Sequence, residues 1–286
     1  MNVTHDSDEK WTLVVKPEVN PFDLRLAELW RYRDLVMLFV RRDFVSTYKQ
    51  TILGPLWFII QPVLTTLTFT IIFGNIAKIP TDGIPQMLFY LSGLVSWNYF
   101  AECLNKTSNT FIGNAHIFGK VYFPRMAVPV SIVISNLVTY FIQFLLFLGF
   151  YVYFIATGTV VHPNAALLLL PFLLIIMACL GLGMGIIISS MTTKYRDLRF
   201  LVTFGVQLMM YATPVIYPMS LLSPKAQFYI SLNPMSSVIE TFRYAFLGSG
   251  NLNFMHLAYS AIFSLSILFI GVLFFNKVEK NFMDTV

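Results

Sequence analysis

Residues whose types could support catalysis or metal binding are few in this sequence and far apart. Asp6 and Asp8 form the D-x-D pattern with which many metal-dependent sugar transferases hold their metal ion. They stand in a polar tail ahead of any expected folded element, and a disordered terminus explains them better. The four histidines are His5, His116, His162 and His256. Their spacing matches no metal site, so no metal is expected.

The segment Gly113–Val121 (GNAHIFGKV) is similar to a nucleotide-binding P-loop. A P-loop needs four residues between its glycines and a Ser or Thr after its Lys. Here five residues separate the glycines, and Val121 follows Lys120. The segment therefore predicts no nucleotide site, and any energy from ATP must come from another chain.

The sequence as a whole is strongly apolar. Of the 286 residues, 57% are hydrophobic and 12% are charged, and the mean hydropathy is +0.70. Soluble domains carry roughly twice that charged fraction. The composition therefore predicts an all-α protein of the lipid bilayer, built from segments of about 20 apolar residues.

Long uncharged runs place these segments. One run of 68 residues, 126–193, is too long for a single crossing and is broken by turn residues near Gly158 and Pro163. Six spans are expected, at 52–74, 86–106, 127–155, 165–190, 199–217 and 254–276. An even number places both termini on one side of the membrane.

The distribution of Lys and Arg orients the spans. With both termini in the cytoplasm, 16 of the 19 basic residues fall inside, and only Lys78, Lys225 and Arg243 fall outside. Such a bias is typical of cytoplasmic loops. The net charge of +5 is therefore a sign of topology. No basic stripe with stacking aromatic residues accompanies it, and no nucleic-acid partner is expected.

Carboxylates are sparse on the expected outer side of the membrane. Only Asp82 and Glu240 are expected on the outer side, which is poor material for an acid–base pair. Glu102, near the inner end of the second span, could couple proton movement to transport. A local ion pair with Lys106, four residues further on, is favoured. Catalytic residues are therefore not expected.

Three further segments have a recognisable pattern. Gly181 and Gly185 form a G-x-x-x-G face, for which packing within the subunit is favoured over a subunit interface. Residues 22–50 form a basic amphipathic helix, which either anchors the N-terminus or receives a cytosolic partner. Between the last two spans, residues 219–248 predict two short re-entrant helices. Asn233 would cap the second helix and Gly248 would end it.

Five segments together carry a resemblance to a known family. They are YKQTILGPLWFIIQP (Tyr48–Pro62), KVYFPRMAVP (Lys120–Pro129), KYRDLRF (Lys194–Phe200), TPVIYP (Thr213–Pro218) and NPMSSVIETFR (Asn233–Arg243). In this order, the chain resembles the permease subunit of ABC-2-type polysaccharide exporters, which move lipid-linked O-antigen, capsule or teichoic acid chains. The resemblance covers most of the sequence.

The resemblance implies a homodimeric channel in the bacterial cytoplasmic (inner) membrane, working with two copies of a cytoplasmic ABC ATPase subunit. ATP and Mg would bind to that partner, and this chain would hold no cofactor. The substrate would be a lipid-linked polysaccharide, with O-antigen favoured. The chain would divide into a cytoplasmic tail (1–21), the amphipathic interface helix (22–50) and the transmembrane domain (51–286), which contacts membrane lipids.

The resemblance also assigns roles to residues of this sequence. Residues expected to couple to the ATPase are Arg31, Arg41, Arg42, Gly113, His116, Lys120, Arg125, Arg196 and Asp197. Residues expected to line the channel are Trp57, Gln61, Thr65 and Thr68 in the first span and Phe204, Gln207, Tyr211 and Thr213 in the fifth. Residues expected at an outer gate are Asn233, Pro234, Glu240 and Arg243, with Glu240 and Arg243 paired at i, i+3.

Two other functions remain open at this point. An ABC-2 exporter of a drug or small lipid would share the architecture, and only a substrate assay separates it. A membrane enzyme that acts on glycolipids would instead depend on a carboxylate, so replacement of Asp82, Glu102 and Glu240 by Ala would distinguish it.

Overall fold

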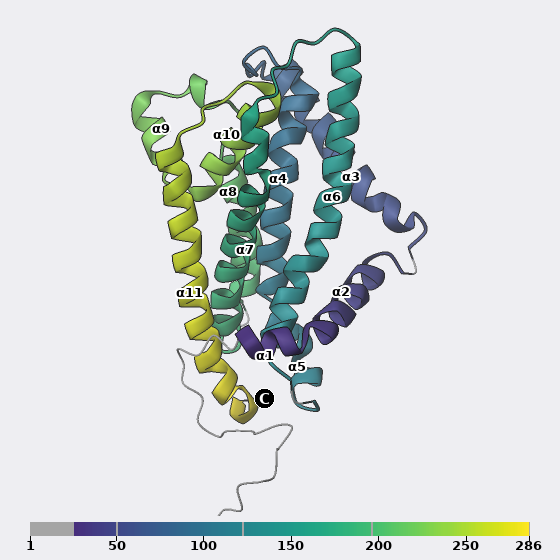
Figure 1. The fold of residues 1–286 in the computed structure, drawn as a ribbon, viewed down its shortest axis with the longest axis vertical. Helices are drawn as coiled ribbons and strands as arrows, with labels where there is room; N and C mark the ends of the chain where they lie inside the picture. Colours follow the sequence, from purple (N-terminus) through teal and green to yellow (C-terminus); the bar gives the residue numbers. More distant parts are fainter. Residues whose placement is uncertain (1–25, 50, 122, 196, 286) are drawn as a thin grey trace, which may run out of the picture.

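In a computed structural model the described residues, 26–49, 51–121, 123–195 and 197–285, form helices and connecting loops without a strand (Figure 1). The first half contains α1 (Leu26–Arg31), α2 (Arg33–Tyr48), η1 (Gly54–Leu56), α3 (Trp57–Phe69), the π-helix η2 (Thr70–Ile76), α4 (Gln86–Thr107), α5 (Thr110–Phe118) and α6 (Ala127–Ala156). The second half contains η3 (Ala165–Leu169), α7 (Leu170–Thr192), α8 (Leu198–Tyr211), η4 (Met219–Leu221), α9 (Pro224–Ser231), α10 (Pro234–Leu247) and α11 (Phe254–Thr285).

Four helical segments are long and apolar enough to cross a bilayer, judged by length and composition. They are Gly54–Ile76, Ala127–Ala156, Ala165–Thr192 and Phe254–Glu279. The expected second span coincides with α4, which has 22 residues but carries Glu102, Lys106 and several amides. All-helical architecture is thus confirmed over the described residues, and four of the expected spans are supported.

The expected fifth span is shorter than predicted. Its helix, α8, has 14 residues and ends at Tyr211 rather than near residue 217. Pro214 disfavours helical backbone at the residue before it, and the chain continues as a turn. At 1.5 Å per residue, α8 is about 21 Å long, which is less than the roughly 30 Å of a hydrocarbon core.

Helix α7 is packed closely between α4 and α11. A side-chain carbon at Gly181 would lie 2.8 Å from Cys103 Cβ on α4, and one at Gly183 would lie 2.7 Å from Leu268 Cα on α11. Small residues permit such close approach of helices. Gly185 likewise faces Thr107 of α4. The expectation that the G-x-x-x-G face packs within the subunit is therefore confirmed.

The expected N-terminal amphipathic helix is present from residue 26 and is divided at Tyr32 into α1 and α2. Figure 1 shows α2 lying obliquely beside the lower part of α6, near α5. Val36, Phe39 and Val40 are buried in a cluster with residues of α5 and α6. Residues 22–25, the tail before them and Arg196 lie outside the described part of the chain.

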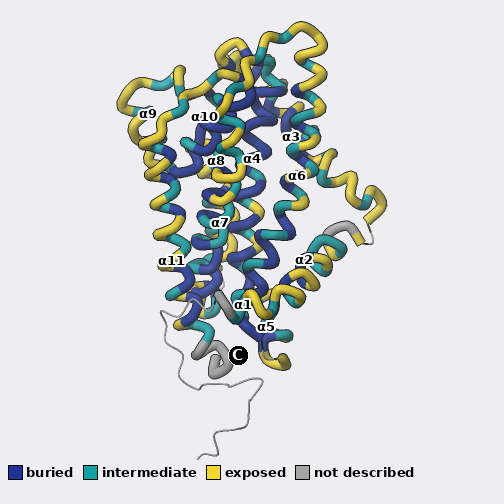
Figure 2. Tube along the Cα trace, viewed as in Figure 1, coloured by how far each residue is buried: buried dark blue, intermediate teal, exposed yellow. Residues whose placement is uncertain are grey.

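Buried residues concentrate along α4, α7 and α10, which are largely dark blue in Figure 2, while α9 and the connecting loops are mostly exposed. The main buried cluster joins α4, α6, α7 and α10. Phe147, Phe242 and Phe246 form mutual ring contacts with centroids 4.9 to 5.4 Å apart. Helix α10 is thus held inside the helical bundle.

Candidate functional site: a buried arginine, a basal junction and an exposed helix face

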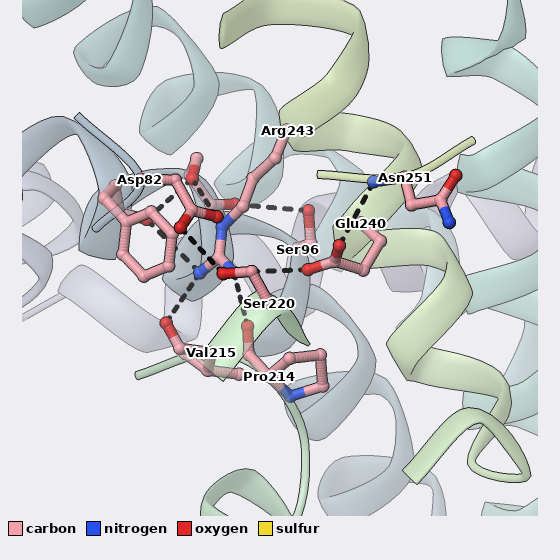
Figure 3. Close-up of polar contacts among 10 residues, drawn as sticks. Asp82, Ser96, Pro214, Val215, Ser220, Glu240, Arg243 and Asn251 are labelled. Atoms are coloured by element: carbon pink, nitrogen blue, oxygen red, sulfur yellow. Dashed lines mark hydrogen bonds and ion pairs between the residues drawn. The ribbon is translucent and has the colours of Figure 1, made fainter. Parts of the chain in front are cut away.

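Arg243 is the centre of a polar cluster at one end of the bundle (Figure 3). Its side chain is 1% exposed, although arginine is rarely buried completely. The guanidinium donates hydrogen bonds to the carbonyl oxygens of Pro214, at 2.6 Å, and Val215, at 2.7 Å. These carbonyls are free because the helix has already ended. Arg243 therefore fastens α10 to the segment that follows α8.

The same guanidinium contacts the first half of α4. It donates to Ser92 Oγ at 3.3 Å and to the Phe89 carbonyl at 3.4 Å, and its carbon lies 3.6 Å from the centroid of the Phe89 ring. A cation over an aromatic face is attracted by the ring quadrupole. A side-chain carbon at Gly93 would lie 2.8 Å from the Arg243 Nη2 atom, so this position needs a glycine.

Glu240 and Arg243 form the expected i, i+3 ion pair, with Oε1 and Nη1 3.7 Å apart. Glu240 Oε2 also accepts a hydrogen bond from the Asn251 backbone N–H at 3.2 Å. Burial raises the pKa of Glu240, and the nearby Arg243 and Asn251 N–H oppose that rise. Burial lowers the pKa of Arg243 to about 10. Each charge therefore depends on its partner for compensation.

Asp82 extends this charged cluster toward the loop before α4. Its carboxylate accepts a hydrogen bond from Ser220 Oγ at 2.7 Å, which joins residues distant in sequence. Its backbone has φ of +52°, a left-handed conformation that Asp tolerates better than most residues. The carboxylate contributes to the raised pKa of Glu240 by like-charge repulsion.

The cap of α10 is confirmed in detail. The Asn233 side chain accepts a hydrogen bond from the Met235 N–H, and Pro234 occupies the first turn. The helix ends at Gly248, whose φ is +70°. The Asn233 amide also donates to Thr213 Oγ1 at 2.7 Å, while that hydroxyl donates to the Met209 carbonyl. Thr213 is completely buried, which corrects its prediction as a channel-lining residue.

The structure thus brings Asn233, Pro234, Glu240 and Arg243 together on α10 and its cap, as parts of a packed structure. Sequence reasoning missed Phe89, Ser92 and the two carbonyls that bind the guanidinium. A buried arginine with one nearby acid needs further acceptors. The proline-bounded segment Thr213–Pro218, which cannot continue a helix, was the available sign of free carbonyls.

At the opposite end of the bundle, Arg125 joins three elements. Its Nη1 donates to the Glu279 carbonyl on α11 at 2.6 Å, and its Nε lies 3.9 Å from Glu279 Oε1. Its guanidinium carbon lies 5.6 Å from the Phe118 ring on α5. Arg125 lies two residues before the first residue of α6, so it connects α5, the start of α6 and the end of α11.

Most other residues expected to couple to an ATPase are exposed around this end. Arg42 is half-buried, pairs with Asp43 at 2.8 Å and lies over the Phe39 ring at 4.7 Å. The exposed ones are Arg31, Arg41, Gly113, His116, Lys120 and Asp197. Arg196 cannot be placed, because it lies outside the described residues. Arg125 and Arg42 therefore each make packed contacts with their own neighbours. The other described residues of this group are accessible.

Except for Thr213, which follows α8, the expected lining residues lie on helices α3 and α8, both of which contact α4. Apart from Thr213, they are exposed or half-buried within the single chain. The exposed ones are Trp57, Gln61, Thr68, Phe204, Gln207 and Tyr211, and Thr65 is half-buried. In the most apolar 18-residue stretch of the first span, only 17% of the residues are buried. These helices therefore present a large apolar surface with interspersed polar groups.

Glu102 and Lys106 form the favoured ion pair, with Oε2 and Nζ 3.0 Å apart. Lys106 also donates to Asn136 Oδ1 on α6 at 3.0 Å. Among the described residues, no group of three or more His, Cys, Asp and Glu side chains could hold a metal ion.

Comparison with known proteins gives the family. Residues 34–247 match the ABC-2 type transporter family. An O-antigen export system permease protein, RfbA of Klebsiella pneumoniae, is 29% identical over 252 residues, which is 88% of this chain and 94% of that protein. The polysialic acid transport protein KpsM of Escherichia coli is 24% identical over 85% of this chain and 93% of its own length. The inner membrane transport permease YadH of Escherichia coli K12 is 26% identical over 66% of this chain and 75% of its own length.

The match covers most of the helical bundle, from the start of α2 to the end of α10. Proteins of this family are non-catalytic membrane subunits that pair with ATPase subunits, so the alternative of a glycolipid-modifying enzyme is not retained. The chain belongs to the ABC-2 type transporter family and is a permease subunit.

Proposed function

We propose that this protein is the channel-forming permease of an ATP-driven exporter that moves lipid-linked O-antigen polysaccharide across the bacterial inner membrane. The observation that carries the proposal is its similarity to RfbA, an O-antigen export permease, along 94% of that protein's length. An alignment of this extent includes the exposed faces of α3 and α8 as well as the buried core. Similarity to KpsM keeps a capsular polysaccharide as the second candidate.

The proposed membrane topology has six crossings, with α4 and α8 added to the four long apolar segments. Both termini lie in the cytoplasm, as the distribution of basic residues indicates. Helix α8 is short for a crossing, and the segment after it completes the passage only because Arg243 satisfies its carbonyls. Irregular backbone in a bilayer requires such internal partners.

Two subunits form the channel, and each binds one cytoplasmic ABC ATPase subunit. The exposed surface around α1, α2 and α5 receives the ATPase, and Arg196 and Asp197 provide a second contact. Movement of α5 reaches α6 and α11 through Arg125, because its guanidinium contacts Phe118 and Glu279. The ATPase thus supplies energy that this chain cannot obtain itself.

The channel lies between the subunits and is lined by α3 and α8. Trp57, Phe204 and Tyr211 offer apolar faces on which sugar rings can rest, and Gln61, Thr65, Thr68 and Gln207 offer hydrogen-bonding groups. Many weak contacts suit the passage of a long polymer, since tight binding at one point would stop it. Helix α10 and its cap support the outer end of this passage.

A cellular experiment tests the substrate. Deletion of the gene is expected to remove O-antigen from the cell surface and to leave lipid-linked polysaccharide on the cytoplasmic side of the inner membrane. Complementation with the gene is expected to restore export. Unchanged surface polysaccharide together with altered tolerance of a drug would contradict the proposal and support the drug or small-lipid alternative.

A further inference from the structure

A cavity lies beside the buried Glu240–Arg243 ion pair, between α9, α10 and the first turn of α11. It is a cavity of about 290 Å³, at the lower end of the volumes of small-molecule sites. Its residues come from three separate segments of the chain. Members that carry the argument are Gln227, Phe228, Glu240, Thr241, Asn253 and His256.

The lining of this cavity combines polar side chains with apolar surface and carries little charge. Among the described residues that line it, Glu240 is the only Asp or Glu, and none is a Lys or Arg. The carboxylate is already shared between Arg243 and the Asn251 N–H. An anion such as phosphate would be repelled by Glu240, and a divalent cation would find too few oxygen ligands of negative charge. The cavity therefore favours an uncharged ligand with many hydrogen-bonding groups.

Several lining groups have hydrogen-bonding capacity to spare. Thr241 is 1% exposed, and within the described part of the chain no hydrogen bond engages its hydroxyl. Asn253 uses its Oδ1 atom to cap α11 at the Met255 and His256 N–H groups. Its amide nitrogen, and the His256 ring, have no hydrogen bond to another described residue. Asn253 is exposed and His256 is half-buried, so both can meet a ligand. Thr241 is buried, and a buried hydroxyl without a partner is costly, so a ligand could supply that partner.

Hydrogen bonds in the cavity wall also fix the orientation of its polar groups. Gln227 donates to the carbonyls of Met219 and Leu222, at 2.9 and 3.0 Å, which fixes its amide and leaves Oε1 as an acceptor. Phe228 borders the cavity and is 60% exposed. Amides, a hydroxyl and an imidazole beside one aromatic ring form a surface suited to the hydroxyl groups and C–H faces of a sugar.

We infer that this cavity binds one or two sugar units of the exported glycan on the outer side of each subunit. The inference rests on the proposed function, because it assigns a place where the emerging chain is held. The site is outside the α3 and α8 faces that line the proposed channel. Weak attachment at this position would favour outward progress by holding the leading end of the polymer.

Binding to the complete exporter tests the inference. The probe is a fluorescent oligosaccharide, released by mild acid from the lipid-linked polysaccharide of the same strain and free of lipid. The permease in complex with its ATPase, in nanodiscs, is expected to bind it saturably. Thr241→Val removes one hydroxyl at nearly constant volume and is expected to weaken binding at least about fivefold, the effect of one lost hydrogen bond.

Two matched variants separate binding from folding. Thr241→Ser retains a hydroxyl and is expected to bind like the parent protein, and so is Ser266→Ala, whose hydroxyl bonds to its own helix at Ile262. Unchanged binding by Thr241→Val would overturn the inference, as would complete displacement of the probe by glycerophosphoethanolamine, which would assign the cavity to an amine headgroup. Absence of saturable binding by an exporter that still transports polysaccharide refutes the site alone, whereas absence of transport refutes the proposed function.

Discussion

The Arg243 guanidinium lies 2.7 Å from the Val215 carbonyl oxygen, and this contact joins the buried helix α10 to the segment that follows α8. The arginine is 28 residues further along the chain and completely buried. It donates hydrogen bonds to the Pro214 and Val215 carbonyls, which lie beyond the end of α8 at Tyr211. The Arg243 side chain therefore contributes strongly to the stability of this end of the protein.

Replacement of Arg243 by Met is expected to destabilise the protein by about 3–5 kcal/mol, because it leaves Glu240 buried without its partner. The double variant Arg243→Met/Glu240→Gln should recover part of that loss, since the uncompensated charge is gone. Thermal unfolding of the purified permease in detergent measures both. Equal stability of the single and double variants would show that the ion pair does not matter.

Stability should also depend on pH through Glu240. Burial raises its pKa in the folded protein, so the folded state binds this proton more tightly than the unfolded state. The resulting stabilisation is present below about pH 4.5, the ordinary value, and is lost as the pH rises through the raised pKa. The Tm of the parent minus that of Glu240→Gln should be near zero at low pH and become negative as the pH increases. A difference that is constant with pH would contradict this.

Gly93→Ala tests the closeness of Arg243 to α4. The added carbon would lie 2.8 Å from Nη2 and 3.1 Å from the Val215 carbonyl, so a loss of about 1–3 kcal/mol is expected. Gly149→Ala is the matched control in another apolar helix, because nothing lies within 4 Å of its added carbon. Similar melting temperatures for the two variants would mean that the guanidinium can move aside at no cost.

Arg125→Ala is expected to separate ATP hydrolysis from transport, because it removes the contact between α5 and the end of α11. The complex with the ATPase should still assemble and hydrolyse ATP, while export falls by about tenfold or more. Lys277→Ala, at an exposed position on α11 that has no assigned role, serves as the control for loss of a basic charge. If Arg125→Ala transports normally, this junction does not transmit the movement.

Much of this architecture could be predicted from the sequence because it depends on local chemistry. The cap that Asn233 forms ahead of Pro234 and the helix end at Gly248 each depend on contacts within a few residues. The structure contains both caps of α10. The Gly181 and Gly185 face was also predictable, since small residues at this spacing allow close helix packing.

Other features depend on contacts between distant segments and could not be read from spacing. The sequence places Thr213 within the fifth span, but the helix ends at Tyr211 and the Asn233 amide donates a hydrogen bond to the Thr213 hydroxyl. The cavity beside Thr241 and His256 is assembled from three segments, each unremarkable alone. The end of α8 frees the Pro214 and Val215 carbonyls locally, but only the tertiary structure shows that Arg243 reaches them.

Transport by purified components tests the central claim most directly. The permease and its ATPase, reconstituted in vesicles containing lipid-linked O-antigen, should move the polysaccharide to the side opposite the ATPase when ATP and Mg are present. A glycan-degrading enzyme on each side would report its location. ATP-dependent transfer is the predicted result, with no ATP hydrolysis by the permease alone. A permease that hydrolyses ATP without the ATPase, or a complete complex that leaves the polysaccharide in place, would contradict the account.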